Sequence, residues 1–425
     1  MAAAPTPPSL PGIPPDLIEQ LVRAAADDRL ALVGGAVRDW LLHRVHNDPW
    51  RGVPDLDLVV EPAIEPRSLP AAHRLARTLR QILGSELLGY YQEHAAYGTV
   101  ELELRLTAGP LLLDVASARR ETYPTPGENP EVSFGRLDDD LARRDFTINA
   151  MALLLDGSAR GQLLDPHGGQ VDLKQRQLRF LHPHSVRDDP TRIVRGARYA
   201  ARLGFGLAPE ALEQLRSTLA SWPWAWSPGD PPGQVPRALG TRLRMELDLL
   251  LEREDWLQGL AALQDWGALT LLDAQLQNDR HWHWRLRRAA RLGLPPLAAF
   301  LAGAADPLAL AERLQLPLRQ QRLLAGFLGL RQRLEGQGAE AAAWNAARWS
   351  SLLEEPGCTP AMVALALATG AGPRRPLLRW WLRWRHLDAG TDAVALMAAE
   401  GWKPGPQLGA RLRALRRDRL TGERL

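Results

Sequence analysis

The chain has 425 residues, of which 45% are hydrophobic and 24% charged, and its formal net charge is +3. This composition is ordinary for a soluble globular protein of two to four compact units. No run of about 18 uncharged apolar residues occurs, which excludes a membrane-spanning helix, and the single cysteine, Cys358, excludes an internal disulfide and fits a reducing cytoplasm.

The basic side chains are almost all arginine, and lysine occurs only at Lys174 and Lys403. The flat guanidinium group matches phosphates and base edges, so this bias favours a nucleic-acid partner. A GC-rich genome would produce the same bias, and composition alone therefore leaves the partner open.

Residues 1–28 begin with a small, Pro-rich stretch without the regions of a signal peptide, and we expect a disordered or helical leader there. After it, short apolar or alternating runs predict strands, and apolar residues at helical spacing predict helices. The expected strands are 30–33, 55–60, 99–106, 111–116 and 147–155, and the expected helices are 36–43 and 71–83.

From about Ser185 to the end, Leu, Ala, Arg and Trp recur at helical spacing, interrupted by proline and glycine. The stretch 335–347, rich in alanine and glycine, is the weakest of these helix predictions. We therefore expect an α+β fold, in which a small mixed-sheet head is followed by an elongated, all-helical remainder.

Asp55 and Asp57 lie two positions apart in the second expected strand. Residues i and i+2 of a strand point to the same face, so the two carboxylates converge. Carboxylate oxygens suit Mg²⁺, and Asp114, which interrupts the apolar run of a later strand, is a candidate third acid. A bare Asp-x-Asp is more often a solvated strand end, so the pair needs its context.

Gly34 and Gly35 end the first expected strand and open a helix that carries Arg38 one turn later. Such a turn brings backbone N–H groups and a helix dipole close to a phosphate, to which Arg38 could add a charge-assisted hydrogen bond. An ordinary loop with a surface ion pair between Arg38 and Asp39 explains the same residues equally well.

Two further charged clusters follow. Segment 143–152 reads Arg-Arg-Asp-Phe-Thr-Ile-Asn-Ala-Met-Ala, and its polar residues could hold a triphosphate and a ribose hydroxyl, or simply cap a strand. In segment 188–198, Pro190 suits a first helical position and Asp189 an N-cap, so that Arg192 and Arg195 fall on one stripe of the helix. A solvated basic face is the alternative.

Taken in order, these segments resemble the bacterial-type (class II) tRNA nucleotidyltransferases, a family that includes the bacterial poly(A) polymerases and belongs to the polymerase-β-like superfamily. The matching motifs are Gly-Gly-x-Val-Arg-Asp at 34–39, Asp-x-Asp at 55–57, Arg-Arg-Asp-Phe-Thr-Ile-Asn-Ala at 143–150 and Asp-Asp-x-x-Arg at 188–192. The resemblance covers roughly residues 30–250.

The resemblance implies four parts: the leader at 1–28, a catalytic head at 29–156, a neck that recognises the nucleotide base at 157–250, and a helical body and tail at 251–425 that bind tRNA. It implies the addition of C, A or both to the 3′ end of tRNA from CTP or ATP. Mg²⁺ would be held by Asp55 and Asp57, with Asp114 as the candidate third catalytic acid. The implied nucleotide-binding residues are Gly34, Gly35, Arg38, Arg144, Asp145, Asn149, Asp189, Arg192 and Arg195.

In this family Asp189 and Arg192 would read the incoming base without a nucleic-acid template. Cytosine and adenine each present an exocyclic amine beside a ring-nitrogen acceptor, so a neighbouring carboxylate and guanidinium fit both bases. Uracil and guanine present the opposite arrangement and would leave a buried charge unpaired.

Departures from the family pattern leave the exact product open. His43 stands where glycine is usual, extra residues stand at about 46–53, and segment 121–139, which in relatives governs how many nucleotides are added, is rich in proline and glycine. The enzyme could add CC, only the final A, or CCA. The alternatives are a poly(A) polymerase and a non-catalytic helical RNA-binding protein. The arginine runs that could contact RNA are 285–291, 374–375, 379–385 and 411–419.

Overall fold

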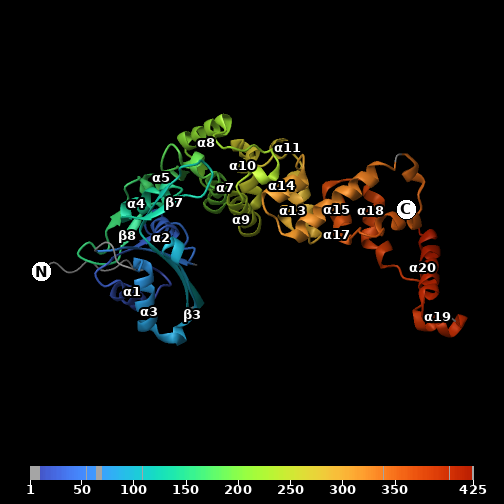
Figure 1. The fold of residues 1–425 in the computed structure, drawn as a ribbon, viewed down its shortest axis with the longest axis horizontal. Coiled ribbons are helices and arrows are strands. Elements are labelled where there is room, and N and C mark those ends of the chain that lie inside the picture. The colour runs from blue at the N-terminus through green and yellow to red at the C-terminus, as the bar shows by residue number, and fades with distance from the viewer. Residues whose placement is uncertain are drawn as a thin grey trace. The chain divides into compact units, whose positions relative to one another are not determined.

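The computed structural model describes residues 10–53, 55–63, 69–107, 109–337, 339–401 and 403–423. The chain divides into two compact units, an N-terminal unit, Met1–Ala225, and a C-terminal unit, Trp226–Leu425. The N-terminal unit combines strands and helices (blue to green in Figure 1), whereas the described residues of the C-terminal unit form helices without a strand. The expected α+β class is confirmed, and the four-part division at 28, 156 and 250 stays a prediction.

A seven-stranded sheet organises the N-terminal unit, in the order β3-β4-β5-β2-β1-β8-β9. Only β2 and β5 run parallel; every other neighbouring pair is antiparallel. Two small two-stranded sheets, β6–β7 and β10–β11, complete the β structure of the described residues. The strands are β1 Arg29–Val33, β2 Asp55–Glu61, β3 Leu88–His94, β4 Thr99–Leu106, β5 Gly109–Ser117, β6 Arg119–Thr122, β7 Glu131–Phe134, β8 Ala152–Leu154, β9 Leu163–Leu164, β10 Gln177–Leu178 and β11 Gly206–Leu207.

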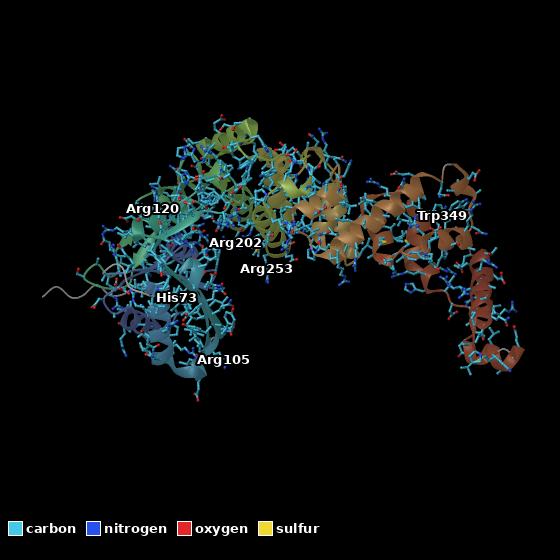
Figure 2. All side chains as sticks on the ribbon, viewed as in Figure 1. His73, Arg105, Arg120, Arg202, Arg253 and Trp349 are labelled. Carbon is cyan, nitrogen blue, oxygen red and sulfur yellow. The ribbon has the colours of Figure 1, made fainter. Side chains whose placement is uncertain are left out.

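Helices α1 and α3 pack against one face of this sheet (Figure 1). Leu56, Leu58 and Val60 of β2 alternate toward that face and are buried. His73 of α3 is also buried, with its Nε2 atom 3.3 Å from the carbonyl oxygen of Thr99 (His73 in Figure 2). The helices of this unit are α1 Pro15–Ala25, α2 Gly35–His46, α3 Ala71–Leu87, α4 Leu137–Ala142, α5 Gly169–Gln175, α6 Ser185–Asp188, α7 Thr191–Leu203 and α8 Pro209–Ser221.

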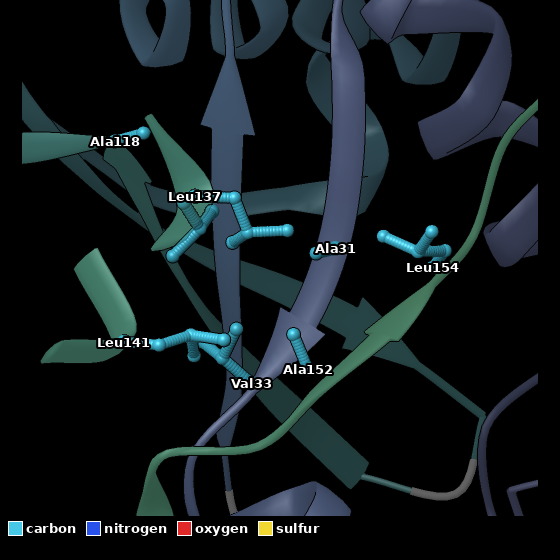
Figure 3. Packing of buried hydrophobic residues seen from close by; sticks show 8 residues of the cluster. Ala31, Val33, Ala118, Leu137, Leu141, Ala152 and Leu154 are labelled. Atoms are coloured by element: carbon cyan, nitrogen blue, oxygen red, sulfur yellow. The ribbon is translucent and has the colours of Figure 1, made fainter. Parts of the chain in front are cut away.

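On the other face of the sheet, α4 covers β1, β2 and β8. There a buried cluster joins small and branched side chains of the sheet to Leu137 and Leu141 of α4 (Figure 3). The sheet contributes Ala31, Val33, Val59, Ala152 and Leu154. This packing fixes α4 beside β2, and α4 leads directly into the charged segment 143–149.

The C-terminal unit is built from short helices whose starts are marked in the sequence. The side chains of Asp255, Asp273, Asp306, Asn345 and Asp392 accept hydrogen bonds from the first N–H groups of α10, α11, α14, α16 and α19. The helices are α9 Arg237–Arg253, α10 Trp256–Trp266, α11 Ala274–Asn278, α12 Trp282–Arg291, α13 Pro296–Leu301, α14 Pro307–Arg313, α15 Leu318–Glu335, α16 Ala346–Leu353, α17 Pro360–Thr369, α18 Arg374–Leu382, α19 Ala393–Glu400 and α20 Pro406–Thr421.

Tryptophan and arginine both enter the core of the C-terminal unit. Trp349 is buried, with its ring centroid 5.0 Å from that of Trp344 (Trp349 in Figure 2). Arg285 is buried too, and it donates to the carbonyl oxygens of Ala299 and Phe300 at the end of α13. Buried arginines therefore satisfy helix-end carbonyl groups in this unit.

Two sequence expectations need correction. Only residues 152–154 of the expected strand 147–155 form a strand, because Thr147–Asn149 make a 3₁₀ turn. The stretch 335–347 is not one helix either: α15 ends at Glu335, and Ala339–Ala343 form a short 3₁₀ segment. The strand β3 was missed, because its polar side chains interrupt the apolar pattern.

Candidate active site

Three carboxylates lie on neighbouring strands at the partly open face of the seven-stranded sheet. Asp55 and Asp57 belong to β2, and the parallel register of β2 and β5 pairs Asp57 with Asp114. Because Leu56 and Leu58 point beneath α3, the acids of β2 point to the opposite face. The expected strands are confirmed and place the three acids together; their catalytic role stays a prediction.

Crowded negative charge shapes the electrostatics of this face. Burial, Asp55 and Asp114 raise the pKa of the Asp57 carboxyl to about 6, although Arg144 acts in the opposite direction. Burial also raises the pKa of Asp114, as does Glu101, which is paired with it on β4. A divalent cation would relieve this repulsion between carboxylates.

The donor set fits a hard cation that keeps water and phosphate ligands. In the part of the chain that the structure describes, no three His, Cys, Asp or Glu side chains surround a common metal position. Asp55 and Asp57 therefore offer a pair of oxygen donors with Asp114 on the adjoining strand. Mg²⁺ is commonly bound by one or two carboxylates, with water and substrate phosphate as further ligands.

The turn at Gly34 approaches these acids so closely that no side chain fits there. Gly34 has a φ of +72° and caps α2, and a Cβ atom on it would lie 2.6 Å from Oδ2 of Asp57 and 3.2 Å from an Nη atom of Arg144. Only glycine adopts this conformation without strain. The first motif, the acid pair and an arginine of the third motif thus converge.

Arg38 lies behind this turn and is 3% exposed. It donates to both oxygens of Asp39, at 2.8 and 3.0 Å, and to Oδ1 of Asn149 at 3.0 Å, and its guanidinium lies 5.5 Å from the ring centroid of Tyr199. Because Arg38 is buried, its ion pair with Asp39 is not the surface pair that the sequence left open as an alternative. The predicted contact between Arg38 and a triphosphate stays a prediction.

One buried acid joins the two arginines of the third motif. Asp140 of α4 has no exposed surface, and its oxygens accept from Arg143 at 2.7 Å and from Arg144 at 3.0 Å. Arg144 also has a buried Nε atom without a hydrogen-bond partner among the described residues. A buried polar atom without a partner beside the Gly34 turn is what a bound anion would satisfy. The sequence carried a signal for Asp140, since it lies three and four positions before the two arginines.

The acid and the amide of the third motif face each other inside the fold. Asp145 accepts from the Phe146 N–H at 2.8 Å and from Asn149 at 3.3 Å, and Arg195 of α7 lies 3.4 Å away. Burial alone would raise the pKa of Asp145, but Arg195 and Arg192 hold it below its ordinary value. Asp145 therefore stays ionised and ties α7 to the third motif.

The proposed base-reading residues open α7. The helix begins at Thr191 with Pro190 as its N-cap, so Asp189 lies one residue before the N-cap and not at the N-cap position that the sequence predicted. Its Oδ1 atom nevertheless accepts from the N–H and the hydroxyl group of Thr191, at 3.1 and 2.7 Å. Asp189 and Arg192 are both buried, at 8% and 3% exposure. Neighbours that sequence reasoning missed here are His182, Tyr123 and Glu121.

The arginine runs of the C-terminal unit separate into structural and exposed members. On α12, Arg285 is buried and pairs with Asp279 at 2.7 Å, whereas Arg287 and Arg291 are exposed. On α20, Arg416 and Arg419 are engaged with acids of the same unit. The exposed face of α12 also carries Trp284, which is 52% exposed. No described helix is long and apolar enough to cross a membrane.

Known proteins are similar to this chain over much of its length. Residues 30–179 match the family model described as the poly A polymerase head domain. The chain is 39% identical over 309 residues to the CC-adding tRNA nucleotidyltransferase of Deinococcus radiodurans, a match that covers 72% of each chain. It is 35% identical over 272 residues to the A-adding tRNA nucleotidyltransferase of Halalkalibacterium halodurans, which covers 62% of this chain and 56% of that one.

Solved structures share the fold over nearly the whole chain. A CCA-adding enzyme in an apo form superposes with a TM-score of 0.70 at 23% identity, covering 97% of this chain and 94% of that one. The Thermotoga maritima CCA-adding enzyme complexed with tRNA superposes with a TM-score of 0.66 at 22% identity, covering 97% and 93%. The mixed-sheet unit followed by helices is therefore a known arrangement.

Proposed function

This chain belongs to the tRNA nucleotidyltransferase family, and on that premise we propose that it transfers nucleotides from CTP, ATP or both to the 3′ end of tRNA. The observation that carries the proposal is the convergence of Gly34, Asp57 and Arg144 within contact distance. It brings together a turn suited to phosphate (Gly34), the acid that we assign to the metal (Asp57) and a guanidinium group (Arg144). A non-catalytic RNA-binding protein has no use for such an arrangement.

We assign Mg²⁺ to Asp55 and Asp57, with Asp114 as the third acid of the face. The metal, when bound, lowers the pKa of the attacking hydroxyl and balances charge on the phosphates. The residues of the chain do the rest. Arg144, whose buried Nε atom has no hydrogen-bond partner within the described part of the chain, neutralises the triphosphate, and the Gly34 turn lets the phosphates approach the backbone.

Base choice is assigned to Asp189 and Arg192. Oδ1 of Asp189 accepts from Thr191, which holds the carboxylate at the start of α7, and we assign the exocyclic amine of the base to this carboxylate. Arg192 would donate to the ring nitrogen beside that amine, so cytosine and adenine fit and uracil does not. Arg195 acts indirectly in this scheme, since it holds Asp145.

The two relatives differ in the nucleotide that they add, and their matches to this chain differ in length. The match to the CC-adding relative is longer, 309 against 272 residues, and covers more of the relative, 72% against 56%, than the match to the A-adding one. We therefore favour addition of C. Poly(A) synthesis is the alternative inside the family. We also propose a cytoplasmic location, because the similar tRNA nucleotidyltransferases come from bacteria.

For the tRNA we propose the exposed face of α12. Trp284, Arg287, Arg288 and Arg291 stand at helical positions i, i+3, i+4 and i+7, which places them on one face. Arg287 lies 5.9 Å from the Trp284 ring centroid, and a hollow beside Trp284 is lined in part by His281, Arg288 and Thr369. Arginines bind phosphates, and an exposed tryptophan stacks on bases.

The test is incubation of the purified full chain and Mg²⁺ with three tRNAs, which end at the discriminator base, at C and at CC. Each receives CTP, ATP, UTP or GTP separately. Extension of the first two by C alone identifies CC addition, extension of the third by A identifies A addition, and both identify CCA addition. Long A tails on unrelated RNA would replace the proposal by poly(A) synthesis, and no extension of any RNA would refute it.

A further inference from the structure

We propose that His182 is a positioning residue for base choice: its Nε2 atom accepts a hydrogen bond from Arg192 and so fixes the guanidinium group that reads the incoming base. The inference rests on the proposed function, because it concerns the same nucleotide site. It adds a residue from outside the family motifs quoted above. His182 lies between β10 and α6, ten positions before the arginine that it contacts.

The guanidinium of Arg192 is held at two points. One Nη atom donates to the carbonyl oxygen of Arg143, at the end of α4, at 2.9 Å. The other lies 3.4 Å from Nε2 of His182. Both partners are acceptors in this arrangement. Within the described residues, no carboxylate accepts a hydrogen bond from Arg192. The remaining N–H groups are thereby left for a ligand.

His182 is itself locked by its backbone. Its N–H group donates to the hydroxyl oxygen of Ser185 at 3.2 Å, and its carbonyl oxygen accepts from Nε2 of Gln214, on α8, at 3.0 Å. Gln214 also donates to the carbonyl oxygen of Pro183 at 2.9 Å. The imidazole therefore stands on a segment with little freedom to move, which a positioning residue requires.

The charge state of the imidazole agrees with an acceptor role. Burial, and then the positive charge of Arg192, lower the pKa of His182 to about 4, with smaller contributions from His184 and His167. A neutral ring that carries its proton on Nδ1 leaves the Nε2 lone pair for Arg192. A protonated ring would repel the guanidinium instead.

Orientation matters because the discrimination is geometric. A guanidinium at a fixed position donates to the ring nitrogen of cytosine and meets an N–H group on uracil, so the wrong base loses a hydrogen bond to a charged donor. A guanidinium free to rotate could turn away from uracil and avoid that loss. Fixing Arg192 therefore affects the choice between bases more than the rate with the correct one.

The experiment compares four variants of the full chain. His182→Leu removes the acceptor, His182→Gln keeps a neutral acceptor near the Nε2 position, Gln214→Leu releases the backbone lock, and His184→Leu is the matched control at an exposed neighbouring histidine. For each, kcat/KM is measured with CTP and with UTP on tRNA that ends at the discriminator base, with the KM for tRNA and the thermal midpoint alongside.

We expect His182→Leu to lower the CTP-to-UTP ratio of kcat/KM by about tenfold, with an unchanged KM for tRNA. His182→Gln should stay within about threefold of the wild type, and Gln214→Leu should show a loss of about threefold. Equal ratios in His182→Leu and His184→Leu would overturn the inference, and so would equal losses in His182→Leu and His182→Gln. If the wild type itself does not prefer CTP or ATP over UTP, the proposed function fails instead.

Discussion

Buried charge distinguishes the two units of the chain. In the N-terminal unit, acids and arginines contact one another around the partly open face of the sheet, as the buried Asp140 does with the partly buried Arg143 and Arg144. In the C-terminal unit, the buried Arg285 and Arg313 donate mainly to backbone carbonyl oxygens, and Arg285 adds an ion pair with Asp279. The buried charged residues are Asp28, Arg38, Asp140, Asp145, Asp172, Asp189 and Arg192 in the first unit, and Glu246, Arg285 and Arg313 in the second.

The difference teaches that the same residue type has two uses here. Arginines of the first unit pair with acids beside the partly open face of the sheet, where the catalytic residues are proposed to lie. Buried arginines of the second unit donate to backbone carbonyl oxygens and so stabilise the fold. Substitutions in the first unit should therefore change transfer, and those in the second should change stability or RNA affinity.

The largest expected effect is that of Asp57→Asn, which should lower kcat for nucleotide transfer by about 10³-fold or more, because the amide cannot replace an ionised metal ligand. The equilibrium affinity for tRNA should stay within about twofold, since Asp57 faces the nucleotide site. Filter binding and single-turnover extension measure the two quantities. Wild-type transfer by this variant would remove the metal assignment.

Gly34→Ala should follow, with a loss of about 100-fold in kcat/KM for CTP. The added methyl group would lie 2.6 Å from Oδ2 of Asp57 and would force a positive φ on alanine, so either the acid or the turn must move. Gly204→Ala, at the end of α7 with a similar φ but nothing within 4 Å of its Cβ position, is the matched control for backbone strain. Equal losses in both variants would mean that strain, and not the contact with Asp57, is responsible.

Stability should respond to pH through Asp57. Its pKa is raised from an ordinary 3.8 to about 6, so the folded state binds this proton more tightly than the unfolded state, and the ionised group destabilises the fold above pH 6. Without divalent cations, Asp57→Asn should be more stable than the wild type by about 1–3 kcal/mol at pH 7–8, and this gain should vanish as pH falls toward 4. Denaturant unfolding at several pH values measures it. Added Mg²⁺ should stabilise the wild type and leave Asp57→Asn unchanged; equal responses would contradict the assignment.

The smallest effect on nucleotide transfer is expected on α12, where two neighbouring arginines should behave differently. Arg288→Ala combined with Trp284→Ala should raise the KM for tRNA by about tenfold, flatten its salt dependence and leave the KM for CTP unchanged. Arg285→Ala should instead lower the unfolding free energy by about 2–4 kcal/mol, because Asp279 and the end of α13 lose their partner. If the double variant loses stability and keeps its tRNA affinity, the exposed face of α12 is not the RNA surface.

The sequence predicted the fold class and most central strands, because alternation along 55–60 and 99–106 is strong when one face is buried. It failed at 147–149, where the apolar pattern is interrupted by a turn that the side chains of Asp145 and Asn149 stabilise. An apolar pattern does not record such side-chain hydrogen bonds. The strand β3 was missed because it is an edge strand with polar side chains.

For the candidate site, the sequence predicted which residue types matter but not which neighbours they touch. Asp55 and Asp57 were predicted from strand spacing and Asp114 from the apolar run that it interrupts, and the register of β2 and β5 places them together. The contact between His182 and Arg192, and the pairing of Glu101 with Asp114, join segments whose packing no local pattern reveals. The product specificity also stays a prediction, because segment 121–139 differs from the family.

Asp140 supports two parts of the candidate site at once. Through Arg144 it supports the side where phosphates and metal would lie, and through Arg143, whose carbonyl oxygen receives Arg192, it supports the side where the base would be chosen. Loss of this one carboxylate would leave Arg143 with Glu121 as its acid partner and would remove the acid that Arg144 contacts. Fidelity and speed would decline together, so the two properties could not be tuned separately through this position.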